Sequence, residues 1–434
     1  METQMKRRYF LTWTAALLVV LATYSSLNLG TQDPDSTGIR TVTWVFAERN
    51  PGILAFYDEV IREFETENPG VEVNYRYLAR MSQRLPTLIA SPTKPDIIFT
   101  QGAGLLQQLY DVGAIRDLSE IMKEDAWVDD FVPAALDNFT YDGKLVGVPH
   151  HITKIDFYYN KRLFDAAGIE AQSIKTWDDF LAAIVELRTS GVTPIAAGPA
   201  DPWTVGIYFG LFATRTCGKE SFVLTMQNDG LGFLRPCMIE AANMVRQLAE
   251  ANAFQQGFGA SKYPKASGLF GDGKAGMILA YSATTPSEQK KNATDGIGLA
   301  FDQIGVTSMP VVAGAPGKRS DIYGAVGGWA LMEGSSDDAL NFLKFLTSEV
   351  NQRKLAALGL NIPVHVAAGT SVTDPLLRDA ADDVQQSEWF QTFIENAMPA
   401  AVGQTMFDVT VDLLNLRISA EESMRKLQSV ADLG

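Results

Sequence analysis

The stretch Gly268–Tyr281, GLFGDGKAGMILAY, contains residue types that could grip a nucleotide phosphate. It begins as G-x-x-x-x-G-K-A, one residue away from the phosphate-binding loop G-x-x-x-x-G-K-[ST]. In that loop the residue after the lysine binds Mg²⁺ through its hydroxyl, and Ala275 has no hydroxyl. The loop also follows a strand and opens a helix, whereas here the apolar run 276–281 comes after the glycines. We therefore interpret the stretch as a turn that enters a strand, and not as a nucleotide site.

The remaining residues that could do chemistry are three histidines and many carboxylates. His150 and His151 are adjacent, and on an extended segment neighbouring side chains point to opposite faces, so they cannot share one metal ion. We expect one of them to be packed and the other to face a cleft. The sequence contains neither a G-x-S-x-G elbow nor an H-E-x-x-H motif, and its 51 acidic residues cannot be paired into a dyad from spacing alone. It therefore predicts no catalytic residue, no metal site and no cofactor.

The N-terminus has the pattern of an export signal. The basic cluster 6–8 precedes the apolar run 10–23, which is too short for an ordinary membrane-spanning helix. We expect residues 1–25 to be a signal peptide that directs the protein to the periplasm. The pair Arg7-Arg8 also fits the twin-arginine pattern, and an uncleaved anchor is the alternative.

Export changes the expectation for the two cysteines and for the net charge. Cys217 and Cys237 are the only cysteines, and in an oxidising compartment we expect them to form a disulfide. The formal charge is −15, and removing residues 1–25, which carry a net +2, leaves about −17. Such a chain is a poor partner for nucleic acid and for anionic membranes.

Strand-like and helix-like patterns alternate along the chain. An apolar strand at 41–46 is followed by a helical face with Ile53, Tyr57, Val60, Ile61 and Phe64, an alternating strand at 71–77, and a short apolar strand at 95–100. A second unit begins after the hairpin signal Asp142-Gly143 and includes a helix capped at Thr176. Two such units predict an α/β protein with two lobes, and ligands of such folds bind beyond the carboxyl ends of the strands.

Several motifs, in order, resemble the extracellular solute-binding proteins of family 1, the carbohydrate-type binding proteins of bacterial ABC importers. The motifs are FETENPGVEV at 64–73, PDIIF at 95–99, DGKLVGVP at 142–149, YYNK at 158–161, FDAAG at 164–168, TWDDF at 176–180, FGDGKAGM at 270–277, GGW at 327–329 and LNIP at 360–363. The resemblance covers essentially the whole mature chain.

The resemblance implies a fold similar to periplasmic binding proteins of type II, with two α/β lobes joined by a hinge. It places residues 38–149 plus 309–333 in the N-terminal lobe and residues 150–308 plus 334–434 in the C-terminal lobe. The hinges are expected near 148–151, 304–308 and 332–335.

The resemblance also implies which residues line a ligand cleft between the lobes. A sugar needs flat apolar faces against its ring and polar groups for its hydroxyls. The expected ligand-binding residues are Glu48, Arg49, Thr100, Gln101, His151, Thr153, Trp203, Tyr281, Gly328, Trp329 and Phe407. An arginine beside the cleft would suit an acidic sugar or a phosphate ester.

The implied function is that of a monomeric periplasmic protein which captures a sugar or small oligosaccharide by hinge closure and delivers it to an ABC importer permease. Three alternatives stay open. The ligand could be a non-sugar solute such as a sugar acid, a phosphate ester or a polyamine. The partner could be a sensor kinase instead of a permease. A secreted glycoside-processing enzyme would differ from both by turning its saccharide over.

Overall fold

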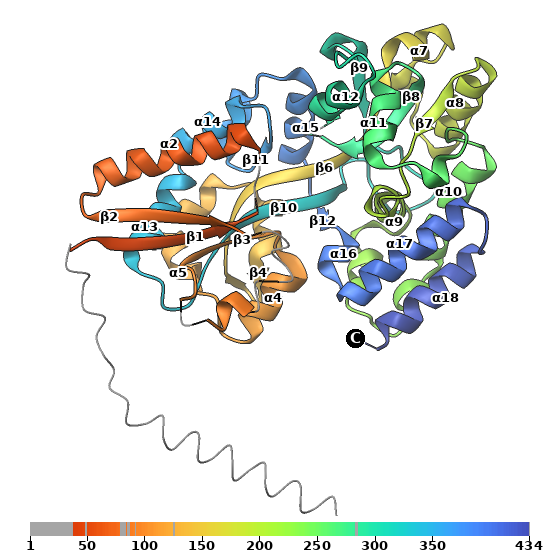
Figure 1. Cartoon of the computed structure of the whole chain (residues 1–434). Helices are drawn as coiled ribbons and strands as arrows, with labels where there is room; N and C mark the ends of the chain where they lie inside the picture. Colours follow the sequence, from red (N-terminus) through yellow and green to blue (C-terminus); the bar gives the residue numbers. More distant parts are fainter. Residues whose placement is uncertain are drawn as a thin grey trace, which may run out of the picture.

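The structure is a computed structural model that describes residues 38–47, 50–78, 84, 87–91, 93–124, 126–282 and 285–433. The expected signal peptide, residues 1–25, lies outside the described residues. Two lobes lie side by side and are joined by long strands (Figure 1). The strands are β1 (Arg40–Phe46), β2 (Val71–Tyr77), β3 (Ile97–Thr100), β4 (Thr140–Tyr141), β5 (Lys144–Leu145), β6 (Val148–Asn160), β7 (Thr193–Ala196), β8 (Ala275–Tyr281), β9 (Ile304–Thr307), β10 (Ile322–Leu331), β11 (Ile362–Pro363) and β12 (Phe390–Thr392).

One sheet extends through both lobes. In the described part of the chain it has ten strands in the order β2-β1-β3-β10-β6-β8-β7, with β9 and β11 paired to β6 and β12 paired to β10. β1 is parallel to β2 and β3, whereas β10 and β6 are antiparallel to their neighbours at the centre. The mixed α/β architecture with two lobes confirms the predicted fold class.

Helices cover β1, β2 and β3 in the N-terminal lobe. They are α2 (Pro51–Glu67), α4 (Ala103–Asp111), α5 (Ser119–Glu124), α6 (Pro133–Leu136), α13 (Asp337–Leu346), α14 (Glu349–Ala357) and α15 (Pro375–Gln385). The start of α2 is fixed locally, because the Asn50 side chain accepts a hydrogen bond from the Gly52 amide at 2.9 Å and Pro51 occupies the first helical position. The predicted apolar face of this helix is buried.

The core of the N-terminal lobe is built around Trp44, which is fully buried. Its ring centroid lies 4.7 Å from that of Tyr57, 4.9 Å from that of Trp329 and 5.3 Å from that of Phe342. These neighbours come from α2, β10 and α13, so residues far apart in the sequence share one aromatic cluster. Edge-to-face contacts of this kind add stability beyond the apolar area that they bury.

The C-terminal lobe has longer helices around β7 and β8. They are α7 (Lys161–Ala166), α8 (Trp177–Thr189), α9 (Trp203–Met226), α10 (Pro236–Glu250), α11 (Tyr263–Gly271), α12 (Thr285–Asn292), α16 (Ile394–Ala397), α17 (Ala400–Leu414) and α18 (Ala420–Ala431). The predicted cap of α8 is present, because Thr176 and Asp179 bond each other's backbone amides in a capping box.

Two further local predictions are confirmed. Asp142 and Gly143 join β4 to β5 with positive φ at both residues, 51° and 75°, as the favoured two-residue hairpin turn requires. Cys217 in α9 and Cys237 in the first turn of α10 form a disulfide. The residue after Cys217, Gly218, interrupts α9 with a non-helical backbone at φ 62°, so the disulfide ties the helix down beside its kink.

Three described segments connect the lobes: β6, β10 and residues 384–393. Ile152 of β6 packs in the N-terminal core, whereas Ile155 packs in the C-terminal core. The same change occurs between Val384 and Trp389. The expected hinge near 148–151 thus lies on a crossing strand, but those near 304–308 and 332–335 do not.

The predicted lobe boundaries after residue 300 are corrected. Residues 337–384 pack in the N-terminal core, to which α13, α14 and α15 contribute Leu343, Leu355 and Val384, and not in the C-terminal lobe. Conversely, β9 pairs with the C-terminal part of β6, and Met309 packs in the C-terminal core. The physical reason is that an amphipathic helix pattern shows that a face is buried but not which of two cores buries it.

The segment between β9 and β10 is held to the C-terminal lobe by a buried arginine. Arg215 of α9 donates hydrogen bonds to the carbonyl oxygens of Met309 at 3.0 Å and Asp321 at 2.8 Å. Burial lowers the pKa of its guanidinium to about 10, so the group stays charged at neutral pH. Residues 309–321, which were expected in the N-terminal lobe, therefore lie against the C-terminal one.

A buried ion cluster links α15 to β6 near the crossing. The Lys154 ammonium lies 3.0 Å from Oδ1 of Asp156 and also pairs with Asp383 of α15. It donates a further hydrogen bond to Ser308, which follows β9, at 3.2 Å. Since α15 packs in the N-terminal core, this cluster ties the two lobes together with charged side chains.

Candidate functional site

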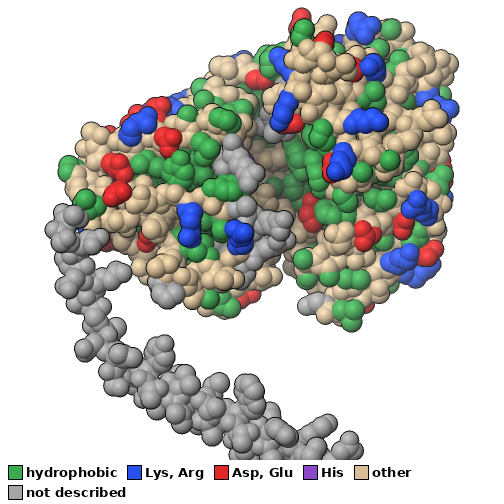
Figure 2. Space-filling model, viewed as in Figure 1, with side chains coloured by type: hydrophobic (Ala, Val, Ile, Leu, Met, Phe, Trp, Pro, Cys, Tyr) green, Lys and Arg blue, Asp and Glu red, His purple; other side chains and the backbone are tan. Residues whose placement is uncertain are grey.

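The carboxyl ends of strands from both lobes meet at the boundary between the lobes. Thr100 ends β3 and lies beside Gly328 of β10, while Tyr281 ends β8 and lies beside Ile155 of β6. Because β6 and β10 are themselves paired, these ends lie over the crossing strands. This is where ligands of open α/β sheets bind. Figure 2 shows a deep groove between the lobes at this place, which we call the cleft.

A cavity of about 430 Å³ lies in the cleft and is lined by both lobes. Its size is within the range of small-molecule sites. Most of its polar lining atoms belong to amides and a hydroxyl. The described residues that line it are Ala47, Phe99, Thr100, Gln101, Gly102, Gly104, Gln108, Glu395, Asn396, Met398, Pro399 and Ala400.

A hydrogen bond between described residues joins the two walls of the cavity. The side-chain amide of Asn396 in α16 donates to Oε1 of Gln101, which follows β3, at 2.8 Å. The helices beside it are also close, because a Cβ atom added at Gly104 of α4 would lie 3.1 Å from the carbonyl oxygen of Asn396. The cavity therefore sits where the lobes already touch.

An aromatic group lies at the end of β8 in the C-terminal lobe, and its rings are not among the described residues that line the cavity. The rings of Trp203 and Tyr281 are stacked, with centroids 5.2 Å apart and an interplanar angle of 15°. The ring centroid of Tyr263 lies 5.0 Å from that of Trp203, and the ring centroid of Phe393 lies 6.0 Å from that of Tyr281. Trp203, Tyr263 and Tyr281 are half-buried, so part of each ring remains accessible. Burial raises the pKa of Tyr281, and its hydroxyl stays protonated.

The two adjacent histidines have different surroundings. His150 is fully buried, with its Nδ1 accepting from the amide of Gln352 and its Nε2–H donating to the Tyr57 hydroxyl, each at 3.2 Å. His151 is half-buried and stacks on Phe99, a cavity residue, with centroids 5.9 Å apart. Burial lowers the pKa of His151 to about 4, so its ring is neutral at neutral pH. One histidine is therefore packed, as expected, and the other lies next to the cavity.

The expected cleft positions of Gly328 and Trp329 are wrong. Trp329 is 0% exposed and lies in the aromatic cluster of the N-terminal lobe, 5.1 Å from the ring of His150. Gly328 is also buried, and a Cβ atom there would lie 2.4 Å from Phe139. The register explains this: Trp329 pairs with Phe99 and Val148 in the middle of the sheet, and its side chain points into the core beneath α2 and α13.

The other expected residues fall into three groups. Thr100 and Gln101 line the cavity, and the Thr100 hydroxyl accepts from the Gly102 amide at 3.2 Å. Thr153, half-buried on β6, and Phe407, whose ring lies against Gly206 of α9, are not among the described residues that line it. Glu48 and Arg49 lie outside the described residues.

Sequence reasoning missed Glu395 and Asn396 on α16. Glu395 lines the cavity, and burial raises the pKa of its carboxyl to about 7. No local pattern marks these positions, because α16 is a single turn that follows the crossing segment. The one related prediction was Gln101, which accepts a hydrogen bond from Asn396; the chain crossing at 384–393 that brings α16 to this place was not predicted.

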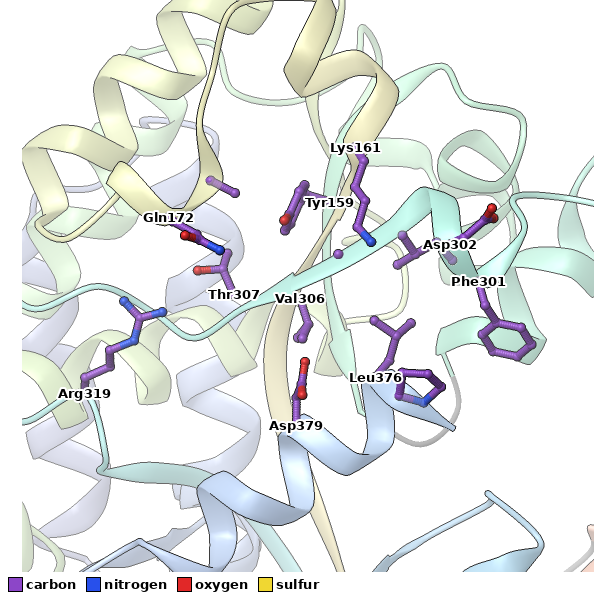
Figure 3. A pocket seen from close by; sticks show the side chains of 14 residues that line it. Tyr159, Lys161, Gln172, Phe301, Asp302, Val306, Thr307, Arg319, Leu376 and Asp379 are labelled. Atoms are coloured by element: carbon purple, nitrogen blue, oxygen red, sulfur yellow. The ribbon is translucent and has the colours of Figure 1, made fainter. Parts of the chain in front are cut away.

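Other cavities among the described residues border the C-terminal lobe, and the two largest of these are candidates as well. One of about 510 Å³ lies between Leu358–Leu360 of the N-terminal lobe and Ser287 and Lys290 of α12, in the part of the cleft beyond α14. The other, of about 630 Å³, lies beside β9 and the start of α15; Tyr159, Lys161 and Gln172 extend into it (Figure 3). Because its charged rim residues are exposed, the latter is a weaker candidate.

Two kinds of feature are absent from the described residues. Within them, no group of three or more His, Cys, Asp and Glu side chains is arranged to hold a metal ion. In the same part of the chain, no helix combines the length and the apolar character that crossing a membrane requires.

The chain is similar to known proteins in sequence and in fold. A periplasmic protein of Rhizobium meliloti named for binding sn-glycerol 3-phosphate is 25% identical over 326 residues, 72% of each chain. An uncharacterised extracellular-binding protein of an ABC transporter from Pyrococcus horikoshii is 30% identical over 231 residues, 49% of this chain and 53% of that protein. A solved chitin oligosaccharide binding protein superposes with a TM-score of 0.77 at 23% identity, covering 91% of this chain and 98% of that one.

The family model of bacterial extracellular solute-binding proteins matches residues 50–353, which include the crossing strands, Thr100, Gln101 and the Trp203–Tyr281 pair. The solved structure supports the same two-lobe fold. The chain therefore belongs to the family of bacterial extracellular solute-binding proteins.

Proposed function

We propose that this protein is a periplasmic carrier that captures a neutral sugar or small oligosaccharide in the cleft and delivers it to an ABC importer permease. The observation that carries the proposal is the inter-lobe cavity, with the stacked rings of Trp203 and Tyr281 nearby. Neither ring is among the described residues that line the cavity, but Tyr281 interacts with Glu395, which is. Aromatic rings supply rigid apolar faces for the C–H surface of a sugar ring. The amides of Gln101, Gln108 and Asn396 supply donors and acceptors for its hydroxyls.

The arrangement of the lobes supports capture by closure. A ligand that contacts both walls of the cleft stabilises the form in which the walls are close, in proportion to its difference in affinity for the open and closed forms. The crossing segments can act as the hinge for this motion. The closed form is then the one that a permease recognises, and the carrier works as a monomer without a cofactor.

The relative named for sn-glycerol 3-phosphate motivates a second candidate, a phosphate-ester solute. The solved chitin oligosaccharide binding protein has the same fold at similar identity, so the comparisons alone do not choose between the two. The aromatic pair in the cleft favours the sugar.

A thermal-shift screen of the purified mature protein tests the proposal. The panel contains glucose, galactose, xylobiose, N,N′-diacetylchitobiose, galacturonate, sn-glycerol 3-phosphate and putrescine. A ligand at 100 times its Kd should stabilise the folded state by about 2.7 kcal/mol. Stabilisation by a sugar that chromatography then recovers intact supports a sugar carrier. Stabilisation only by the phosphate ester or the diamine, or cleavage of the sugar, would contradict it.

A further inference from the structure

Glu395 is an unusual residue for the wall of a cavity because its carboxyl interacts with its own backbone amide, while one of its two oxygens has no hydrogen-bond partner among the described residues. The unpartnered oxygen is Oε2, which is buried. An unsatisfied buried polar atom of this kind costs free energy that a new hydrogen bond would recover. Since Glu395 lines the cleft cavity, a bound molecule is the partner that can reach it.

The backbone of Glu395 is held in place from two sides. The amide of the preceding residue, Ile394, donates to the Tyr323 hydroxyl of β10 at 3.1 Å. On the other side, a Cβ atom added at Gly403 of α17 would lie 2.9 Å from Cα of Glu395, so the two helices are in close contact. A side chain on a fixed backbone can select between ligands, because it does not move away from an unfavourable one.

The charges around Glu395 are equally distinctive. It is the one ionisable side chain among the described residues that line the cavity. The titratable groups that interact with it are Tyr281 of β8 and Tyr323 of β10, and burial raises the pKa of both, so they remain neutral. In the described chain no lysine, arginine or protonated histidine offsets the carboxylate.

We propose that Glu395 is a specificity-determining residue of the cleft, whose carboxyl accepts a hydrogen bond from a hydroxyl or ammonium group of the bound sugar and disfavours sugar acids and phosphate esters. This inference rests on the proposed function, since it assigns a role within the same cleft. The physical basis is that a carboxylate strengthens hydrogen bonds from donors, whereas a second anion beside it is repelled. Discrimination by such a repulsive element is a common source of specificity.

The test compares sugars that differ in charge but not in ring geometry. Calorimetric titrations at pH 8.0 use glucose, galactose, xylobiose and N,N′-diacetylchitobiose on the wild-type protein. The second series compares the neutral, cationic and anionic forms of one ring, which are galactose, galactosamine and galacturonate, or glucose, glucosamine and glucuronate. It also includes sn-glycerol 3-phosphate as a phosphate ester. The variants are Glu395→Gln, which keeps the size of the side chain, and Glu388→Gln, an exposed carboxylate paired with Lys318, as the control for one lost charge.

The expected result has two parts. In the wild-type protein, the uronate and sn-glycerol 3-phosphate bind at least tenfold more weakly than the neutral sugars. In Glu395→Gln, the Kd of the neutral sugar rises about tenfold, because a charge-assisted hydrogen bond becomes a neutral one, and the gap between neutral sugar and uronate narrows. Glu388→Gln changes neither quantity.

Two results would overturn the inference while leaving the proposed function intact. One is a neutral sugar whose Kd is the same within twofold in wild type and Glu395→Gln, with circular dichroism confirming that the variant is folded. The other is a wild-type protein that binds a uronate as tightly as the neutral sugar. If no sugar of any charge binds the wild-type protein, the proposed function fails first and this inference fails with it.

Discussion

Two regions of this molecule contain a tryptophan among other aromatic rings, and they serve different purposes. Trp329 of β10 has rings on several sides and no exposed surface. The ring centroids of Trp44, Phe99 and His150 all lie within 5.3 Å of its own. Trp203 stacks on Tyr281 and touches Tyr263 but stays half-buried. The difference in burial means that only the Trp203 group could serve as a binding surface, because packing covers the rings around Trp329 completely.

The largest effect should come from Trp329. Replacing it with alanine removes a fully buried indole from the N-terminal core, and we expect the free energy of unfolding to fall by about 3–5 kcal/mol. Urea unfolding measures this. The control is Val350→Ala at a side chain that is 64% exposed, for which the change should stay within about 0.5 kcal/mol. If Trp329→Ala were as stable as wild type but no longer bound sugar, Trp329 would belong to the binding surface and not to the core.

Trp203 should show the opposite balance between stability and binding. We expect Trp203→Ala to weaken sugar binding by about 1–3 kcal/mol, as for other aromatic anchors, because the stacked pair loses the Trp203 indole. The same variant should lose less stability than Trp329→Ala. Calorimetric titration and urea unfolding of one preparation give both numbers. Trp203→Phe, which keeps a flat ring, should recover most of the affinity; an alanine variant with wild-type affinity would remove the pair from the site.

The raised pKa of Glu395 separates the cleft from the two cores, because it makes ligand binding depend on pH. Because its pKa is about 7 in the free protein and a hydroxyl donor favours the ionised form, binding of a neutral sugar should release a proton. Affinity should then rise roughly tenfold between pH 6 and pH 8 and level off above. His151, with a pKa of about 4, and the neutral Tyr281 and Tyr323 do not titrate in that range.

Stability of the unliganded protein should change in the other direction. The unfolded chain releases the Glu395 proton near pH 4.3, well before the folded protein does. Between that pH and about 7 the folded state holds more protons, so the free energy of unfolding should fall as the pH rises. Comparing Glu395→Gln with wild type by urea unfolding from pH 4 to pH 8 isolates this contribution. Parallel profiles for the two proteins would argue against the raised pKa.

The smallest effect concerns the hydrogen bond between Gln101 and Asn396. This bond joins the two walls of the cleft on an exposed side, so a double-mutant cycle with Gln101→Ala and Asn396→Ala should give a coupling of about 0.5–1 kcal/mol in sugar affinity. Gln404→Ala is the control, since Gln404 bonds Asp408 within the same helix. Strictly additive effects of the two alanine substitutions would mean that the walls act independently.

The sequence was informative where structure is decided by neighbouring residues. The Asp142-Gly143 turn, the Thr176 cap and the buried face of α2 each depend on a few residues in a row, and each was predictable. The disulfide was also predictable, but from the expected compartment and not from geometry.

The errors concern decisions made by distant parts of the chain. The face of β10 to which Trp329 points is fixed by its register with β3 and β6, and the sequence of β10 alone is apolar throughout. The placement of α13, α14 and α15 depends on which core has an uncovered sheet face. Glu395 could not be found from the sequence, because its proposed role depends on a buried carboxylate oxygen that has no hydrogen-bond partner among the described residues.

The three crossings of the chain have a consequence for its synthesis. The core of the lobe that begins first includes Val384 and Phe390, so it cannot be completed until nearly the whole chain has left the ribosome. The core of the other lobe needs the final helix, α18, as well. Neither lobe is encoded by a continuous piece of the sequence, and a nascent chain that stops before Phe390 leaves both lobes unfinished.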